Sequence, residues 1–246
     1  MRYAETLAAA ALLVLIAWPA AAQVSLGGSV EVATDERRRG ISWSEGKAAP
    51  AASLSLQLPS GFDIGARVTG LRGSPRSGGA DAVVDASIGY GGDLGLGFRG
   101  EGFVVAHAFT GARGRMDYLE GGLGLTYQLG PAQIGADARY APAQSAIGGD
   151  NLYVAARAQL GLPATPYTFA ASIGRSSGAV DDPLRAARLR PGGNYSDWLV
   201  GVRRVTGPVS LGLDYSGTSI DRVMASPYAD ARNSGDRLTA RASFSF

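Results

Sequence analysis

The chain contains no cysteine and only one histidine, His107, among its 246 residues. Without cysteine there is no disulfide, no thiolate metal site and no thiol nucleophile. One histidine without clustered carboxylates does not build a transition-metal site, so we expect no metal and no cofactor. The chain also has no large excess of charge of either sign, because it contains 23 basic and 21 acidic residues and has a net charge of +2. That balance argues against a basic stripe and therefore against a nucleic-acid partner.

Long hydrophobic runs are missing after residue 22. The single apolar run, residues 7–18, follows Arg2 and precedes the small residues of 20–22. It is shorter than the roughly 20 residues that a spanning helix needs. This pattern predicts a cleavable secretory signal peptide over residues 1–22 and a mature domain over residues 23–246.

Glycine, in contrast, is abundant, and the 36 glycines disfavour a helical fold because each costs about 1 kcal/mol inside a helix. The hydrophobic residues alternate with polar ones, which is typical of a sheet with one apolar face. In the last strand, Leu238 to Phe246 place every second residue on one apolar face. A terminal aromatic closing such a strand is what outer-membrane barrels present to their assembly machinery. We therefore interpret Phe244 and Phe246 as a membrane-facing C-terminal signal.

Twelve alternating segments can be marked, and together they predict an all-β fold, an antiparallel up-and-down transmembrane β-barrel of about 12 strands. The segments are 24–34, 51–58, 62–71, 82–90, 94–109, 118–129, 133–140, 152–162, 167–175, 197–205, 209–219 and 237–246. Short Gly/Pro turns at 59–61, 91–93, 130–131, 163–166 and 206–208 alternate with longer polar connections at 35–50, 72–81, 111–117, 141–151, 176–196 and 220–236. A barrel with short periplasmic turns and longer extracellular loops requires this alternation.

The two faces of the strands differ in chemistry. The apolar face, for example Leu54 and Leu56 or Leu123 and Leu125, carries no charge, as contact with outer-membrane lipid requires. The opposite face carries six arginines and six acids, which we interpret as pore-lining. They are Glu31, Arg67, Asp85, Arg99, Glu101, Glu120, Asp137, Arg139, Arg157, Arg203, Asp214 and Arg241.

The first long connection resembles that of a known family. Residues 39–42, Arg-Gly-Ile-Ser, and residues 44–47, Ser-Glu-Gly-Lys, are similar to the opening loop of the TorF family of porin-like exported proteins. The aromatic residues usual before the Arg-Gly pair are replaced by Glu36 and Arg38, and Pro50 is displaced by two alanines. The resemblance covers essentially the whole mature chain and implies an outer-membrane barrel of about this length, without a known substrate.

These patterns favour an outer-membrane channel that passes small polar solutes by diffusion through a narrow lumen with weak charge selectivity. A structural or adhesive barrel with a plugged lumen, whose extracellular loops bind a partner, is the alternative. An outer-membrane hydrolase would depend on His107, which we interpret as a rim residue because no nucleophile motif accompanies it. A secreted soluble β-sandwich is a fourth hypothesis. The 176–196 connection is expected to be an ordinary loop, with a short helix or an inward constriction as the alternative.

Overall fold

The protein is a closed barrel of twelve antiparallel strands in a computed structural model that describes residues 24–221, 225 and 231–246. Each strand pairs with its neighbour in the chain, and β1 pairs with β14 to close the ring. The barrel strands are β1 (Ser25–Ala33), β4 (Ala49–Gln57), β5 (Phe62–Ser74), β6 (Ala80–Gly95), β7 (Phe98–Thr110), β8 (Tyr118–Leu129), β9 (Ala132–Gln144), β10 (Gly149–Gly161), β11 (Tyr167–Ser177), β12 (Tyr195–Thr206), β13 (Val209–Thr218) and β14 (Arg237–Ser245). The predicted fold class and strand number are confirmed. The predicted signal peptide lies outside the described residues.

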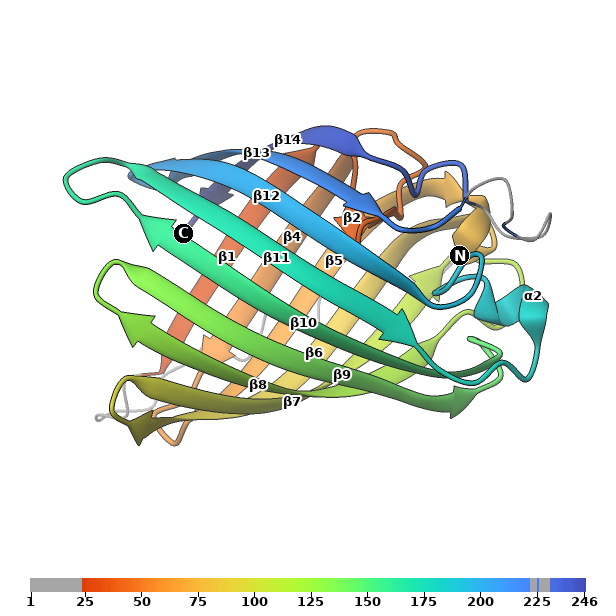
Figure 1. Ribbon diagram of the computed structural model, residues 1–246, viewed down its shortest axis with the longest axis horizontal. Coiled ribbons are helices and arrows are strands. Elements are labelled where there is room, and N and C mark those ends of the chain that lie inside the picture. The colour runs from red at the N-terminus through yellow and green to blue at the C-terminus, as the bar shows by residue number, and fades with distance from the viewer. Residues whose placement is uncertain (1–23, 222–224, 226–230) are drawn as a thin grey trace, which may run out of the picture.

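The connections differ between the two ends of the barrel (Figure 1). One end, which we call the short-turn end, holds the tight hairpins and the start of β1 and end of β14. The other, the long-connection end, holds a 3-10 turn, η1 (Pro75–Ser77), and one short helix, α2 (Pro183–Ala186). Within the described residues, no helix is long and apolar enough to cross a membrane.

The β6–β7 hairpin turns later than the sequence predicts. Glycine and aspartate at 91–93 indicate a turn, but β6 continues through them and Gly95 pairs with Phe98. The turn is made by Leu96 and Gly97, with φ of 54° and 84°. Two consecutive positive φ angles match the right-handed twist of the flanking strands, so this hairpin closes tightly. The predicted turn at 91–93 is therefore wrong, because glycine in a strand also marks close approach: a Cβ at Gly91 would lie 3.1 Å from Arg99 Nη2.

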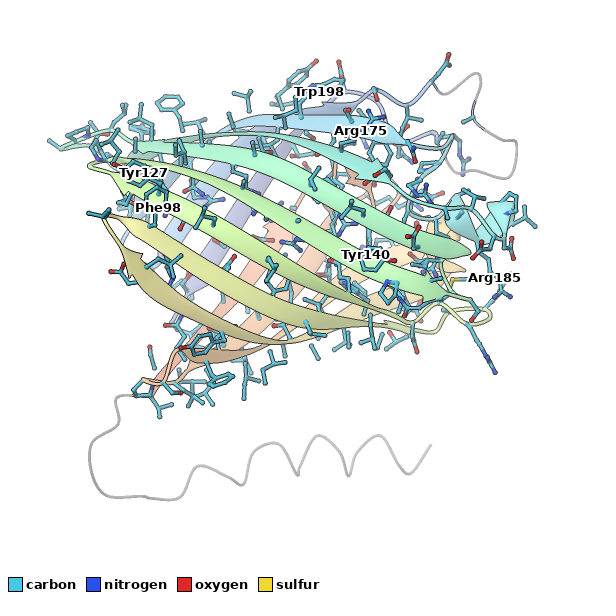
Figure 2. The ribbon with its side chains drawn as sticks, turned by 60° about the horizontal axis from the view of Figure 1, so that its bottom comes forward. Phe98, Tyr127, Tyr140, Arg175, Arg185 and Trp198 are labelled. Atoms are coloured by element: carbon cyan, nitrogen blue, oxygen red, sulfur yellow. The ribbon has the colours of Figure 1, made fainter. Side chains whose placement is uncertain are left out.

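The outer surface is apolar along the strands. Large side chains of the predicted apolar face stand exposed on it, including Leu123, Ile134 and Leu213. Aromatic pairs gather at the short-turn end, where the rings of Phe98 and Tyr127 lie 4.7 Å apart (Figure 2). A water-soluble protein has a largely polar surface, whereas this surface is apolar along the strands and suits a lipid environment.

Candidate functional site in the lumen

The connection from β1 to β4, residues 34–48, folds into the barrel, and we call it loop one. It contains a small hairpin of β2 (Arg37–Arg38) and β3 (Ile41–Ser42). Asp35 holds its base by accepting hydrogen bonds from Ser42 Oγ at 2.5 Å and Ser44 Oγ at 3.0 Å. The buried residues of the loop, polar and apolar, show that it packs inside the wall.

The tip of loop one is left-handed. Arg39 and Gly40 have φ of 52° and 73°. A Cβ on Gly40 would lie within 3 Å of Thr218 Cγ2, the Gly217 carbonyl and Asp197 Cβ, so only glycine fits this tip against β12 and β13. The tip thereby contacts the wall two and three strands away from β1 in the ring.

Two arginines of loop one form ion pairs with the wall. Arg38 Nη2 lies 2.7 Å from Asp85 Oδ2 on β6, and Arg39 Nη2 donates to Glu120 Oε2 on β8 at 2.6 Å. The Arg39 guanidinium also lies 4.6 Å from the ring centre of Tyr153 on β10. Burial acts to lower the pKa of Arg39, but the Glu120 carboxylate outweighs it and holds that pKa above its ordinary value. Loop one is therefore bound across the lumen by charged contacts to several strands.

His107 joins these two ion pairs. Its Nδ1 lies 2.7 Å from Asp85 Oδ1, and its Nε2 lies 3.7 Å from Glu120 Oε1. The ring stacks on Tyr118 at 4.4 Å and is 6% exposed. The interpretation of His107 as a rim residue is wrong, because the inward phase of β7 turns it toward the two carboxylates that bind loop one. No serine or threonine of the described chain hydrogen-bonds to it.

An apolar cluster fills the space beside these charges at the long-connection end. Trp43 of loop one packs on Phe109 of β7 with ring centres 5.8 Å apart, among Leu71, Val83 and Ile147. The Arg38 guanidinium lies 4.3 Å above the Trp43 ring, a cation–π contact. Loop one is thus held by apolar contacts as well as by charge.

The β11–β12 connection, residues 178–194, is also folded inward, and the expectation of an ordinary loop is wrong. Asp182 caps the short helix α2 by accepting from the backbone N–H groups of Leu184 and Arg185. Arg188 is buried and donates to the carbonyls of Ala146 at 2.5 Å and Met116 at 3.1 Å. Burial lowers the pKa of Arg188 to about 10. These backbone contacts tie the connection to two neighbouring ones, a constraint that composition does not show.

The twelve residues predicted to line the pore divide into two groups. Eight of them take part in ion pairs in the lumen: Glu31, Arg67, Asp85, Glu120, Asp137, Arg139, Arg157 and Arg241. The other four form no ion pair within the described part of the chain: Arg99, Glu101, Arg203 and Asp214. The paired group joins strands that lie far apart in the sequence, for example β1 to β5 and β14 through Glu31.

A polar cavity of about 270 Å³ lies between loop one and the β8–β13 wall. Arg39 and Ile41 of loop one line it on one side, and Arg139, Arg157 and Ser172 line it on the wall side. In the chain as far as it is described, no group of three or more His, Asp or Glu side chains is placed to hold a metal ion. The arrangement therefore offers charge and hydrogen-bond donors to a solute.

The family of the chain follows from its sequence over nearly its full length. The chain belongs to the bacterial family of unknown function described as Gcw_chp. The family model matches residues 17–244. A search of curated proteins finds no match.

Solved structures similar to this barrel include porins. The KdgM porin superposes with a TM-score of 0.59 at 7% identity, over 89% of this chain and 99% of its own. The KdgM porin in complex with disordered oligogalacturonate gives 0.58 at 8% identity, over 90% and 98%. LpxR from Salmonella typhimurium gives 0.49 at 11% identity, over 89% and 99%. At such identities the two KdgM structures show the fold, which is that of an outer-membrane porin-like β-barrel.

Sequence reasoning missed the residues of loop one that fill the lumen, namely Arg38, Arg39 and Trp43. One signal could have found them: Ile41 and Trp43 are apolar side chains in an otherwise polar connection. A solvated loop has no reason to carry them, whereas a loop folded inward buries both.

Proposed function

We propose that this protein is an outer-membrane channel for small polar solutes, which cross by diffusion through a narrow lumen restricted by loop one. The observation that carries the proposal is the pairing of an apolar outer wall with charged side chains that remain accessible inside it. Arg157, on the inner face of β10, keeps 44% of its side chain exposed. This exposure means that space for water reaches the inner face of β10 beside loop one.

The same proposal covers the location of the protein. Residues 1–22 direct export, and the strand ending in Phe244 and Phe246 is recognised by the barrel-assembly machinery. Outer-membrane lipid then surrounds the apolar face, with the long-connection end outside the cell. The resemblance of loop one to the TorF family supports this reading. No catalytic role is proposed for His107, since it binds the carboxylates that anchor loop one.

Planar-bilayer recording of the refolded protein tests the channel. We expect small conductance steps in the wild type, because loop one occupies much of the lumen. The heat-dependent shift of the folded barrel on a gel serves as the folding control. Folded protein that gives no steps at any voltage would overturn the proposal.

A second candidate, a structural or adhesive barrel with a plugged lumen, is favoured by the contacts of loop one with β6, β7, β8 and β10. The double variant Arg38→Ala, Arg39→Ala separates the two. If the wild type is silent and the variant conducts, loop one is a permanent plug and the second candidate holds.

A further inference from the structure

Two charge clusters in the lumen share one design, a carboxylate between two arginines. In the first, Arg67 Nη2 and Arg241 Nη1 lie 2.7 and 2.8 Å from Glu31 Oε1. In the second, Arg157 Nη2 lies 2.7 Å from Asp137 Oδ1 and Arg139 Nε lies 3.3 Å from Asp137 Oδ2. Each of these carboxylates thus contacts two arginines, and one arginine of each cluster also lies near a second acid: Arg67 is 3.8 Å from Glu36 Oε2 and Arg139 is 3.6 Å from Glu120 Oε1.

The acids and the arginines of these clusters differ in exposure. The side chains of Glu31 and Asp137 are 11% and 5% exposed, whereas those of Arg139 and Arg157 are 31% and 44% exposed. The wall thus contains equal numbers of acids and arginines, but in these clusters the arginines are the more exposed of the two. In these two clusters the carboxylates lie against the wall, and the charged groups that water and solutes meet are guanidiniums.

The clusters also face each other. In the ring of strands, β1 with Glu31 and β9 with Asp137 are six places apart out of twelve, so they stand on opposite walls. A solute in the lumen therefore has N–H donors on both sides.

The second cluster borders the cavity beneath loop one. Of the carboxylates that line this cavity, Glu120 has a side chain only 3% exposed and is bound by Arg39, while Asp197 is buried and accepts from Tyr153 Oη at 3.2 Å. Arg157 forms an ion pair with Asp137 through Nη2, and its other N–H groups have no partner among the residues that the structure describes. Those N–H groups are available to a ligand, and a guanidinium matches the oxygens of a carboxylate in geometry.

We propose that the cavity beneath loop one binds carboxylate-bearing solutes through Arg157 and Arg139, so that the channel prefers small organic anions to cations. This rests on the proposed channel function and names its class of solute. Cations are disfavoured in this cavity because its two carboxylates are buried, Glu120 against Arg39 and Asp197 beside Tyr153. A volume of about 270 Å³ accommodates a small solute together with some of its water.

Two measurements on the refolded barrel test the proposal. The first is the reversal potential in a potassium chloride gradient, which we expect to show chloride passing more readily than potassium. The second is block of that current by sodium glucuronate, with neutral glucose as the matched probe. Glucuronate is expected to reduce the current at concentrations where glucose does not. Calorimetric titration of the protein with glucuronate measures binding independently of conduction.

Arg157→Gln is the test variant, because Asp137 keeps Arg139 as a partner and the fold survives. We expect it to lower the chloride preference at least about twofold and to weaken glucuronate block and binding by about tenfold, the loss of one charged hydrogen-bonding group. Arg115→Gln, which makes the same change in the exposed 111–117 connection, is the control and should leave both unchanged.

The outcomes separate the two proposals. Conduction without chloride preference and without glucuronate binding overturns the anion site and leaves the channel standing. Glucuronate binding to folded protein that never conducts overturns the channel and leaves the site standing. Equal effects of Arg157→Gln and Arg115→Gln overturn the assignment of the site to Arg157.

Discussion

Arg39 and Glu120 meet inside the barrel, Nη2 to Oε2 at 2.6 Å, and join the tip of the first connection to a strand on a distant part of the wall. Both side chains are largely removed from water, with exposures of 16% and 3%. In such a pair the loss of one partner leaves the other charge buried without compensation. The position of loop one should therefore be sensitive to either residue.

Removing this ion pair should release loop one. We expect Arg39→Ala to raise the single-channel conductance and to increase its fluctuation, because Glu120 no longer holds the tip. Glu120→Gln should give the same change with a smaller amplitude, since the amide still accepts a hydrogen bond. Bilayer recording measures both, with Arg115→Ala as the control of equal charge change for Arg39→Ala. Conductance identical to the wild type in Arg39→Ala would show that loop one does not restrict the lumen.

His107 should stabilise the folded barrel, because it lies between the Asp85 and Glu120 carboxylates and contacts both. In His107→Leu the Oδ1 atom of Asp85 loses its partner at 2.7 Å while Oδ2 keeps Arg38, and we expect the free energy of unfolding to fall by about 1–3 kcal/mol. His107→Gln keeps a donor near Asp85 and should lose less. Urea unfolding of the refolded barrel, followed by tryptophan fluorescence, measures the difference. If both variants unfold like the wild type, the histidine does not support the anchoring of loop one.

A charged substitution on the lipid-facing wall should destabilise the barrel most near the middle of the bilayer. Leu123 lies midway along β8 and Leu129 ends the strand on the same face at the short-turn end. We expect Leu123→Arg to cost about 2–4 kcal/mol of unfolding free energy and Leu129→Arg about 0–1 kcal/mol. Denaturant unfolding in phospholipid vesicles compares the two. Equal costs would contradict a bilayer centred on the middle of β8.

Arg188 should keep the β11–β12 connection closed against proteolysis. Arg188→Ala removes the hydrogen bonds to the Ala146, Met116 and Arg76 carbonyls, so we expect the connection to open and trypsin to cut faster after the exposed Arg185. Leu184→Ala, an exposed position in the same connection, is the control. Mass spectrometry of the fragments over time gives the two rates. Equal rates in the two variants would mean that Arg188 does not restrain the connection.

The sequence predicted the wall of the barrel well and its contents poorly, for a physical reason. Alternation of side chains reports which face of a strand meets lipid, so the phase of Leu123 and Leu125 was readable without a structure. Whether a connection folds into the lumen or outward produces no such periodic pattern in the sequence. The inward course of Arg38 and Arg39 depends on where Asp85 and Glu120 stand in the closed barrel, and those positions are 47 and 81 residues further along the chain.

The turn at Leu96 and Gly97 shows a different limit. Glycine serves both turns and close contacts within strands, and composition does not distinguish the two uses. Here Gly91 lies beside Arg99, and the turn begins at Leu96, three residues after the end of the Gly91-Gly92-Asp93 segment. The exposed Leu96 at its centre is not a turn-forming residue by preference.

Loop one leaves and rejoins the wall at neighbouring points, since Ala33 on β1 pairs with Ala49 on β4. Loop one is therefore bound inside the barrel as a ligand would be, but both of its ends are covalently joined to the wall, so it does not diffuse away. Short tethers hold such a ligand at an effective concentration in the millimolar range. When a contact between loop one and the wall breaks, the loop stays close to the wall and can form that contact again. The loop is thus expected to open as brief, reversible excursions, and the barrel to close itself again without a partner.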